Sequence, residues 1–132
     1  MAIESPYPYF TVHELVCQGS DCGCDHGLHM DREFMEKIVA MRMELGFPFI
    51  VHSAYRCPVH NNQVSKTGFD GPHASGRAID IAVSGTRAHA LVHCANQHFI
   101  TGIGVNQKGP HNQRFIHLDD LQGDLRPWIW SY

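Results

Sequence analysis

Between Asp31 and Gly46 the apolar residues recur every three or four positions, which is the spacing of an amphipathic helix. The apolar stripe consists of Phe34, Ile38, Met41 and Leu45. Asp31 suits the N-cap, because its carboxylate can accept hydrogen bonds from the free N–H groups of the first helical turn. Gly46 suits the left-handed position after the last turn, and Pro48 prevents the helix from continuing. The pattern therefore predicts one long helix that buries one face.

Shorter apolar runs, separated by Gly, Pro and polar residues, predict the remaining elements. Strands are expected at residues 49–52, 78–83, 101–105 and 114–119. Further helical segments are expected at residues 11–15, 58–64 and about 84–98. The helices and strands lack the regular β-α-β alternation of a parallel sheet. This mixture favours an α+β fold with a central antiparallel sheet flanked by helices.

The chain length of 132 residues indicates one small domain, 1–132, in which residues 1–29 form an N-terminal arm and a Cys- and Gly-rich loop. The net charge of −3 gives no basic surface for nucleic acid, and no apolar run is long enough to cross a membrane. We therefore expect neither nucleic-acid binding nor membrane insertion, and we expect a monomer. Residues 1–6 lack the basic and apolar regions of a secretory signal peptide, so we expect synthesis in the cytoplasm.

Five cysteines are present, and Cys17, Cys22 and Cys24 lie close together in the Gly-rich loop. An odd number of cysteines without a signal peptide argues against a disulfide framework. The cluster is either a small structural zinc or redox site, or a loop with reduced thiols. We favour the loop with reduced thiols, because the spacing is tight and irregular and differs from paired Cys-x-x-Cys motifs.

Eleven histidines invite a metal hypothesis, and the segment 71–80 gives the strongest case for it. His73 comes from a turn and Asp80 from the strand that follows, so both side chains can point at one ion. Zn²⁺ accepts an imidazole nitrogen and a carboxylate oxygen at about 2.0–2.2 Å. The other interpretation is a surface turn with a solvated histidine and a capping aspartate.

The strand expected at 114–119 offers a third ligand, His117. Alternate residues of a strand share a face, so His117 and Asp119 point the same way. If this strand lies beside that of Asp80, then His73, Asp80 and His117 bind Zn²⁺ and leave a fourth position for water, as in catalytic zinc sites. The ion would lower the pKa of this water toward about 7 and polarise a substrate carbonyl.

Three further residues are candidates for catalysis, each with a structural alternative. Asp119 is either a base for the water or a partner that orients His117. His111 is either a second base or oxyanion-stabilising group, or a loop histidine. Arg56 follows a predicted strand, and it either grips a substrate carboxylate with two hydrogen bonds or forms a surface ion pair.

Several motifs resemble, in order, those of the zinc D-Ala-D-Ala carboxypeptidase and L,D-endopeptidase superfamily, the M15 peptidases. The central motif, His-x-x-Gly-x-Ala-x-Asp, consists of His73, Gly76, Ala78 and Asp80. The flanking motifs are Ser53-Ala54-Tyr55-Arg56 with His60-Asn61, then Phe115-Ile116-His117-Leu118-Asp119, then Gly123-Asp124-Leu125-Arg126-Pro127-Trp128. The similarity extends from about Phe10 to Trp128, and the combination of motifs makes it specific.

The resemblance implies a small α+β fold, hedgehog-like or D-Ala-D-Ala-peptidase-like, with one Zn²⁺ held by His73, Asp80 and His117. It implies that Arg56 holds a substrate carboxylate or helps to polarise the scissile carbonyl. It also implies that the substrate is the peptide stem of peptidoglycan, which a carboxypeptidase or endopeptidase would cut. A bacteriophage endolysin or virion-borne hydrolase, which reaches the cell wall by release or injection, fits a single domain without a signal peptide. A bacterial origin stays open.

One departure from the family pattern concerns the general base. Many relatives carry a His two residues, or a Glu or Asp three residues, before the last zinc ligand, whereas this chain has Phe115 and Arg114. Neither side chain accepts a proton at neutral pH, so the base must be Asp119, His111 or another group. The same departure favours an alternative function, a non-catalytic zinc-containing module for cell-wall binding or phage assembly. The bond that is cut also stays open.

Overall fold

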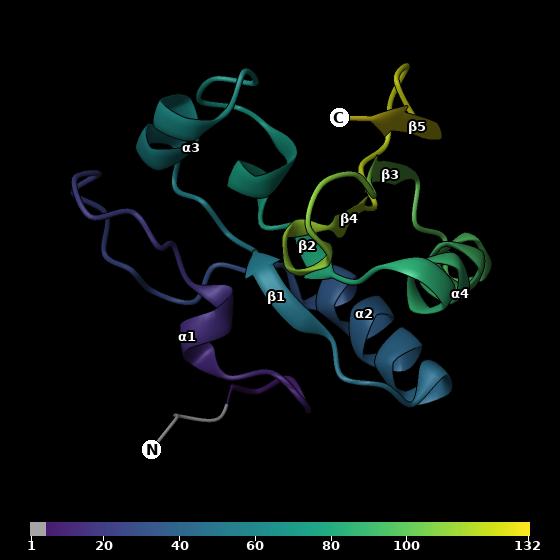
Figure 1. The fold of residues 1–132 in the computed structure, drawn as a ribbon. Coiled ribbons are helices and arrows are strands. Elements are labelled where there is room, and N and C mark those ends of the chain that lie inside the picture. Colours follow the sequence, from purple (N-terminus) through teal and green to yellow (C-terminus); the bar gives the residue numbers. More distant parts are fainter. Residues whose placement is uncertain (1–4) are drawn as a thin grey trace.

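A computed structural model describes residues 5–132, and this part of the chain forms a five-stranded sheet with helices around it (Figure 1). The strands are β1 (Ile50–Ser53), β2 (Ala78–Ala82), β3 (Gly102–Asn106), β4 (Phe115–Asp119) and β5 (Trp128–Ser131). Their order in the sheet is β1-β2-β4-β3-β5. The neighbouring pairs are antiparallel except β3 and β5, which are parallel. The α+β class is thus confirmed, and β5 adds a parallel edge that the sequence analysis did not expect.

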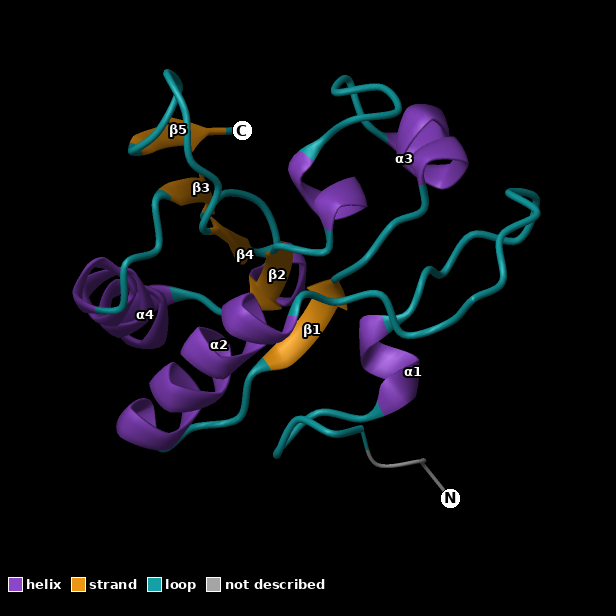
Figure 2. Cartoon of the chain, turned by 180° about the vertical axis from the view of Figure 1, so that it is seen from behind, coloured by secondary structure: helices purple, strands orange, loops and turns teal. Residues whose placement is uncertain are grey.

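The longer helices pack on one face of this sheet. They are α2 (Arg32–Leu45) and α4 (Gly85–Gln97), which lie side by side in Figure 2. Their buried side chains join a core with the inward-facing residues of the central strands, Ile79, Ile81, Ile116 and Leu118. The shorter helices are α1 (Val12–Leu15) and α3 (Pro58–Val64), with 3₁₀ turns η1 (Pro72–Ser75) and η2 (His111–Gln113). These two helices leave the opposite face of the sheet uncovered.

The boundaries of α2 follow from its end residues. The Asp31 carboxylate accepts a hydrogen bond from the backbone N–H of Phe34 at 3.0 Å, as expected of an N-cap. Gly46 has a φ of 74° and ends the helix in the left-handed conformation. In residues 5–132, no helix has both the length and the apolar character needed to cross a bilayer.

The N-terminal segment partly matches the expected arm. Tyr7 and Phe10 are buried against the core, and Tyr9 is exposed. Thr11 and Glu14 form a capping box that starts α1, which agrees with the helical segment expected at 11–15. Residues 1–4 of the expected arm lie outside the described residues. From residue 16 to residue 31 the chain has no helix or strand, so other interactions must fix this loop.

Candidate metal centre

The antiparallel register of β2 and β4 places Asp80 directly opposite His117. On the same strands Ile79 pairs with Leu118 and points into the core, so Asp80 and His117 point to the other face. His117 Nδ1 lies 2.9 Å from Oδ1 of Asp80. Strand pairing therefore brings two of the predicted ligands together, although they are far apart in the sequence.

The third predicted ligand, His73, lies on η1, just before the chain turns into β2. Gly76 ends η1 with a φ of 76°, a conformation that residues with a Cβ rarely adopt. A Cβ at this position would also collide with the carbonyl oxygen of His29. His73 Nδ1–H donates to the carbonyl oxygen of Ala54 at 2.7 Å, which leaves Nε2 facing Asp80 at 3.3 Å from Oδ1. The turn thus aims the histidine at the carboxylate.

The three side chains form a donor set that fits Zn²⁺. One ligand atom from each of His73, Asp80 and His117 lies within 4.8 Å of the others. All three residues are buried, with 5%, 7% and 2% of their surfaces exposed. Two imidazole nitrogens and one carboxylate oxygen supply three protein ligands, the number typical of catalytic zinc sites, which keep one position open. The structure therefore brings the predicted ligands together at one point.

The charges at this point suit a cation. Burial raises the pKa of the Asp80 carboxyl, but hydrogen bonds from His117 and His73 outweigh burial and hold this pKa below its ordinary value. Burial lowers the pKa of His117, but hydrogen bonds to Asp119 and Asp80 raise it above its ordinary value. Asp80 is therefore ionised, and a divalent cation would replace the proton that lies between His117 and Asp80.

Asp119 contacts Nε2 of His117, whereas Asp80 contacts Nδ1 on the other side of the ring. His117 Nε2–H donates to Oδ2 of Asp119 at 2.8 Å, and Arg126 donates to both carboxylate oxygens at 2.9 Å. Burial raises the pKa of Asp119, but His117 and Arg126 lower it to about 2. A Cβ at Gly102 would collide with this carboxylate, so the glycine makes room for it. Of the two roles open to Asp119, these contacts favour the partner that orients His117.

Arg56 lies beside the ligands and is held by side chains on either side. Its Nε donates to Oγ of Ser53 at 3.2 Å, and one terminal nitrogen donates to Oδ1 of Asn61 at 3.2 Å. The other terminal nitrogen lies 3.9 Å from Oδ2 of Asp80. Asn61 is itself buried, and its amide donates to the Gly68 carbonyl at 2.6 Å. Asn61, to which the sequence analysis gave no role of its own, therefore positions the guanidinium.

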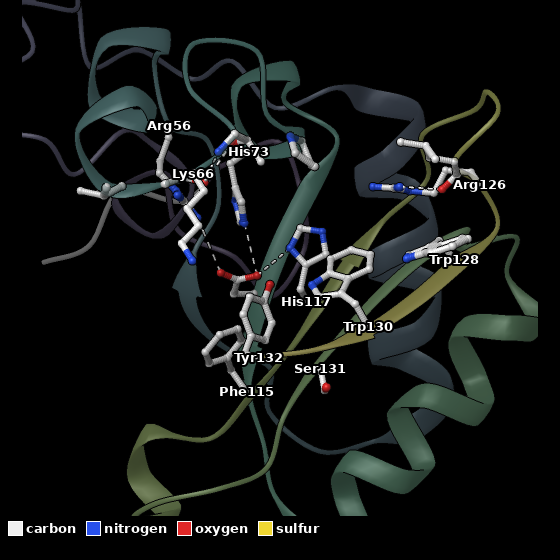
Figure 3. Close-up of a pocket in the computed structure, with 16 residues that line it drawn as sticks. Arg56, Lys66, His73, Phe115, His117, Arg126, Trp128, Trp130, Ser131 and Tyr132 are labelled. Atoms are coloured by element: carbon white, nitrogen blue, oxygen red, sulfur yellow. Dashed lines mark hydrogen bonds and ion pairs between the residues drawn. The ribbon is translucent and has the colours of Figure 1, made fainter.

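The ligands lie in a pocket of about 920 Å³ (Figure 3). Its aromatic lining residues are Phe115, Trp128, Trp130 and Tyr132. The Trp130 ring centre lies 5.0 Å from that of His117, and parallel pairing of β5 with β3 sets Trp130 beside Gly104. A Cβ at Gly104 would lie only 2.7 Å from the indole, so the glycine allows this contact. The alternation of aromatic residues at 128, 130 and 132 is the signal that could have predicted β5.

A family model described as Peptidase M15 matches residues 8–119, which is most of the chain and includes the three candidate ligands and Arg56. The chain belongs to the M15 peptidase family. Family membership makes it a metallopeptidase by class, and M15 peptidases are generally zinc-dependent. No curated protein matches the chain. The matched region ends at Asp119, so β5 and Arg126 lie outside the region that defines the family.

This M15 peptidase departs from the sequence-based expectation at His111. His111 is exposed on η2, where its Nδ1 lies 3.2 Å from Oγ of Ser84, and it does not line the pocket. The structure therefore does not bring His111 to the metal centre, because its ring lies against Ser84 at the start of α4. Phe115, at one of the positions where relatives carry a base, lines the pocket with its ring 5.1 Å from that of Tyr132.

Proposed function

We propose that this M15 peptidase is a zinc-dependent hydrolase that cuts amide bonds in the stem peptides of peptidoglycan, as a carboxypeptidase or an endopeptidase. The proposal rests on one observation: the buried side chains of His73, Asp80 and His117 lie close enough together in a large pocket to bind one ion. The Arg56 guanidinium, 3.9 Å from Asp80, supplies a positive group beside them. The site of action would be the cell wall, in phage lysis or in bacterial wall turnover.

The charge of the pocket supports an acidic peptide as substrate. Among the described residues that line it, the only carboxylate is Asp80, whereas Arg56, Lys66 and Arg126 are cationic. Arg126 is already paired with Asp119, so Arg56 and Lys66 remain to meet the substrate. Stem peptides carry free carboxylates, which complement these groups. The aromatic residues of the pocket supply apolar surface for the aliphatic parts of the peptide.

Each residue of the centre has a separate task in the proposed reaction. Zn²⁺, when bound, would supply a Lewis acid that polarises the scissile carbonyl. His117 is held in one tautomer by Asp119, and His73 is held in one tautomer by the Ala54 carbonyl. Arg56 is fixed by Ser53 and Asn61, so its free N–H groups can donate to the developing oxyanion or to a substrate carboxylate without reorganisation.

A second candidate function is a zinc-containing binding module without catalysis. This function is favoured because Asp80, a candidate metal ligand, is the only Asp or Glu among the described residues that line the pocket. No second carboxylate side chain there can act as the general base. Lys66 and Tyr132 also line the pocket, and neither is a carboxylate. Burial is the main cause that raises the pKa of Tyr132, so its hydroxyl is protonated at neutral pH and is a hydrogen-bonding group rather than a base.

Cleavage of purified peptidoglycan by zinc-loaded protein distinguishes the two candidates. The proposal predicts new amino groups over time, lost with a chelator and in His73→Ala, and retained in the control His89→Ala on the far helix α4. Co-sedimentation with peptidoglycan but no new amino groups would support the binding module instead. Neither binding nor release of amino groups would contradict both candidates.

A further inference from the structure

Four cysteines converge at a second place in the molecule, away from the pocket. The Sγ atoms of Cys17, Cys22, Cys24 and Cys57 lie within 4.8 Å of one another. The first three come from the loop between α1 and α2, and Cys57 is the N-cap of α3. Spacing along the chain groups only the first three, because Cys57 lies far from them in the sequence. The fold therefore completes a set of four thiols.

The distances within this set fit a tetrahedral ion better than a disulfide. Cys22 Sγ lies 3.9 Å from Cys17 Sγ and 3.5 Å from Cys24 Sγ, and all four thiols are free. In a tetrahedral site with zinc–sulfur bonds of about 2.3 Å, the sulfur atoms lie about 3.8 Å apart. A disulfide joins two sulfurs at about 2.05 Å and gives no reason for the other two to approach.

The surroundings of the four thiols suit thiolates. The backbone N–H of His26 donates to Cys24 Sγ at 3.4 Å, and that of His60 donates to Cys57 Sγ at 3.4 Å. Such donors stabilise negative charge on metal-bound sulfur. Cys17 and Cys57 are buried, so the cluster is closed on one side by protein. A Cβ at Gly19 would lie 3.0 Å from Cys22 Sγ, which shows how tightly the loop packs here.

The loop that carries three of the cysteines has no regular secondary structure to hold its shape. Residues 16–31 form no helix or strand, and an ordered loop of this length within a compact domain is uncommon without a constraint. A metal that joins Cys17, Cys22 and Cys24 of this loop to Cys57 supplies such a constraint, and its binding energy adds to the folding energy.

We propose that Cys17, Cys22, Cys24 and Cys57 bind a second Zn²⁺ with a structural role. Four protein ligands leave no open position, so this ion takes no part in the hydrolysis. It joins the loop after α1 to the start of α3, where Arg56 precedes Cys57 and Asn61 holds the Arg56 guanidinium. The site is thus independent of the proposed reaction but lies next to a residue used in it.

Elemental analysis of the protein purified under reducing conditions tests the proposal. The native chain should carry about two zinc ions. Cys57→Ser should lose one ion, His73→Ala combined with His117→Ala should lose the other, and Cys94→Ser, a buried thiol outside the cluster, should lose neither. No difference in zinc content between Cys57→Ser and Cys94→Ser would overturn the proposal.

Cobalt substitution gives a second readout that needs only the native fold and remains decisive if Cys57→Ser is unstable. Co²⁺ bound by four thiolates gives intense thiolate-to-metal charge-transfer absorption in the near ultraviolet, which imidazole and carboxylate ligands do not give. The native protein and the variant with both His73→Ala and His117→Ala should show this absorption. Its absence from both, or disulfides found by thiol alkylation and intact mass, would overturn the proposal while leaving the pocket and its proposed function untouched.

Discussion

Arg126 donates two hydrogen bonds to the carboxylate of Asp119, from Nε and from a terminal nitrogen, each 2.9 Å long. Asp119 in turn accepts the Nε2–H of His117 at 2.8 Å. A residue of the segment between β4 and β5 thus fixes the orientation of a candidate metal ligand through one intermediate carboxylate. Loss of such supporting contacts in metal sites commonly lowers metal affinity by about 10–100-fold.

Arg126→Gln should therefore weaken zinc binding at the pocket by about 10–100-fold without removing a ligand. The affinity can be measured by competition with a chromophoric chelator in a protein with Cys57→Ser, so that only the pocket ion is counted. Arg114→Gln is the matched control, because the Arg114 side chain donates to the Gly109 carbonyl at the surface and does not contact Asp119. Equal affinities of the two variants would contradict the role given to Arg126.

Arg56→Lys should lower kcat/KM on stem peptides by about 10²–10³-fold while leaving zinc content unchanged. A lysine keeps the charge but cannot donate at once to Ser53, to Asn61 and to substrate in the planar geometry of a guanidinium. Arg32→Lys, at the start of α2, controls for the loss of a guanidinium elsewhere. Steady-state kinetics with a synthetic stem peptide gives the comparison, and full activity of Arg56→Lys would remove Arg56 from the reaction.

Trp130→Ala should raise KM more than it lowers kcat, because the indole lines the pocket beside His117 but offers no group that reacts. Removing it takes apolar surface from substrate binding and leaves the ligands in place. Phe99→Ala is the control, because Phe99 is exposed outside the pocket. A fall in kcat with unchanged KM would instead assign Trp130 to the positioning of His117.

The metal-free protein should lose stability as the pH falls from about 4 toward about 2. The pKa of Asp119 is lowered to about 2 in the folded chain, whereas an unfolded chain binds the proton near pH 4. The stabilisation is therefore present above the unfolded value and disappears as the folded carboxylate is protonated. His117 acts in the opposite direction, because its pKa is raised and its contribution disappears as the pH rises through that value.

Urea unfolding in the presence of a chelator, repeated across this pH range, gives the measurement. Asp119→Asn should make the curve of unfolding free energy against pH flatter at the acid end. An unchanged slope in Asp119→Asn would show that other carboxylates cause the acid loss. Asp124→Asn, at an exposed position between β4 and β5, is the control and should follow the native curve.

Local signals were sufficient for much of the fold. The caps Asp31 and Gly46 and the apolar stripe between them determine the ends and the buried face of α2, and all three can be read from neighbouring residues. The strand of Asp80 and the strand of His117 were also predictable from short apolar runs. Their pairing was a condition of the three-ligand hypothesis, and the register of β2 with β4 meets it.

The features that the sequence did not reveal all depend on contacts between distant segments. β5 joins the sheet through parallel pairing with β3, and only this pairing brings Trp130 to the pocket. The role of Asp119 depends on Arg126, and the set of four thiols depends on Cys57. The placement of His111 away from the pocket was likewise decided by the path of a loop, for which periodicity gives no information.

Mass spectrometry of muropeptides after digestion with zinc-loaded protein tests the central claim most directly. We expect new stem-peptide fragments, whose summed mass exceeds that of the parent by one water for each amide bond cut. These fragments should be absent with a chelator and with His117→Ala, and present with Cys94→Ser. A zinc-loaded, folded native protein that leaves every stem peptide intact would contradict the claim that His73, Asp80 and His117 form a peptidase centre.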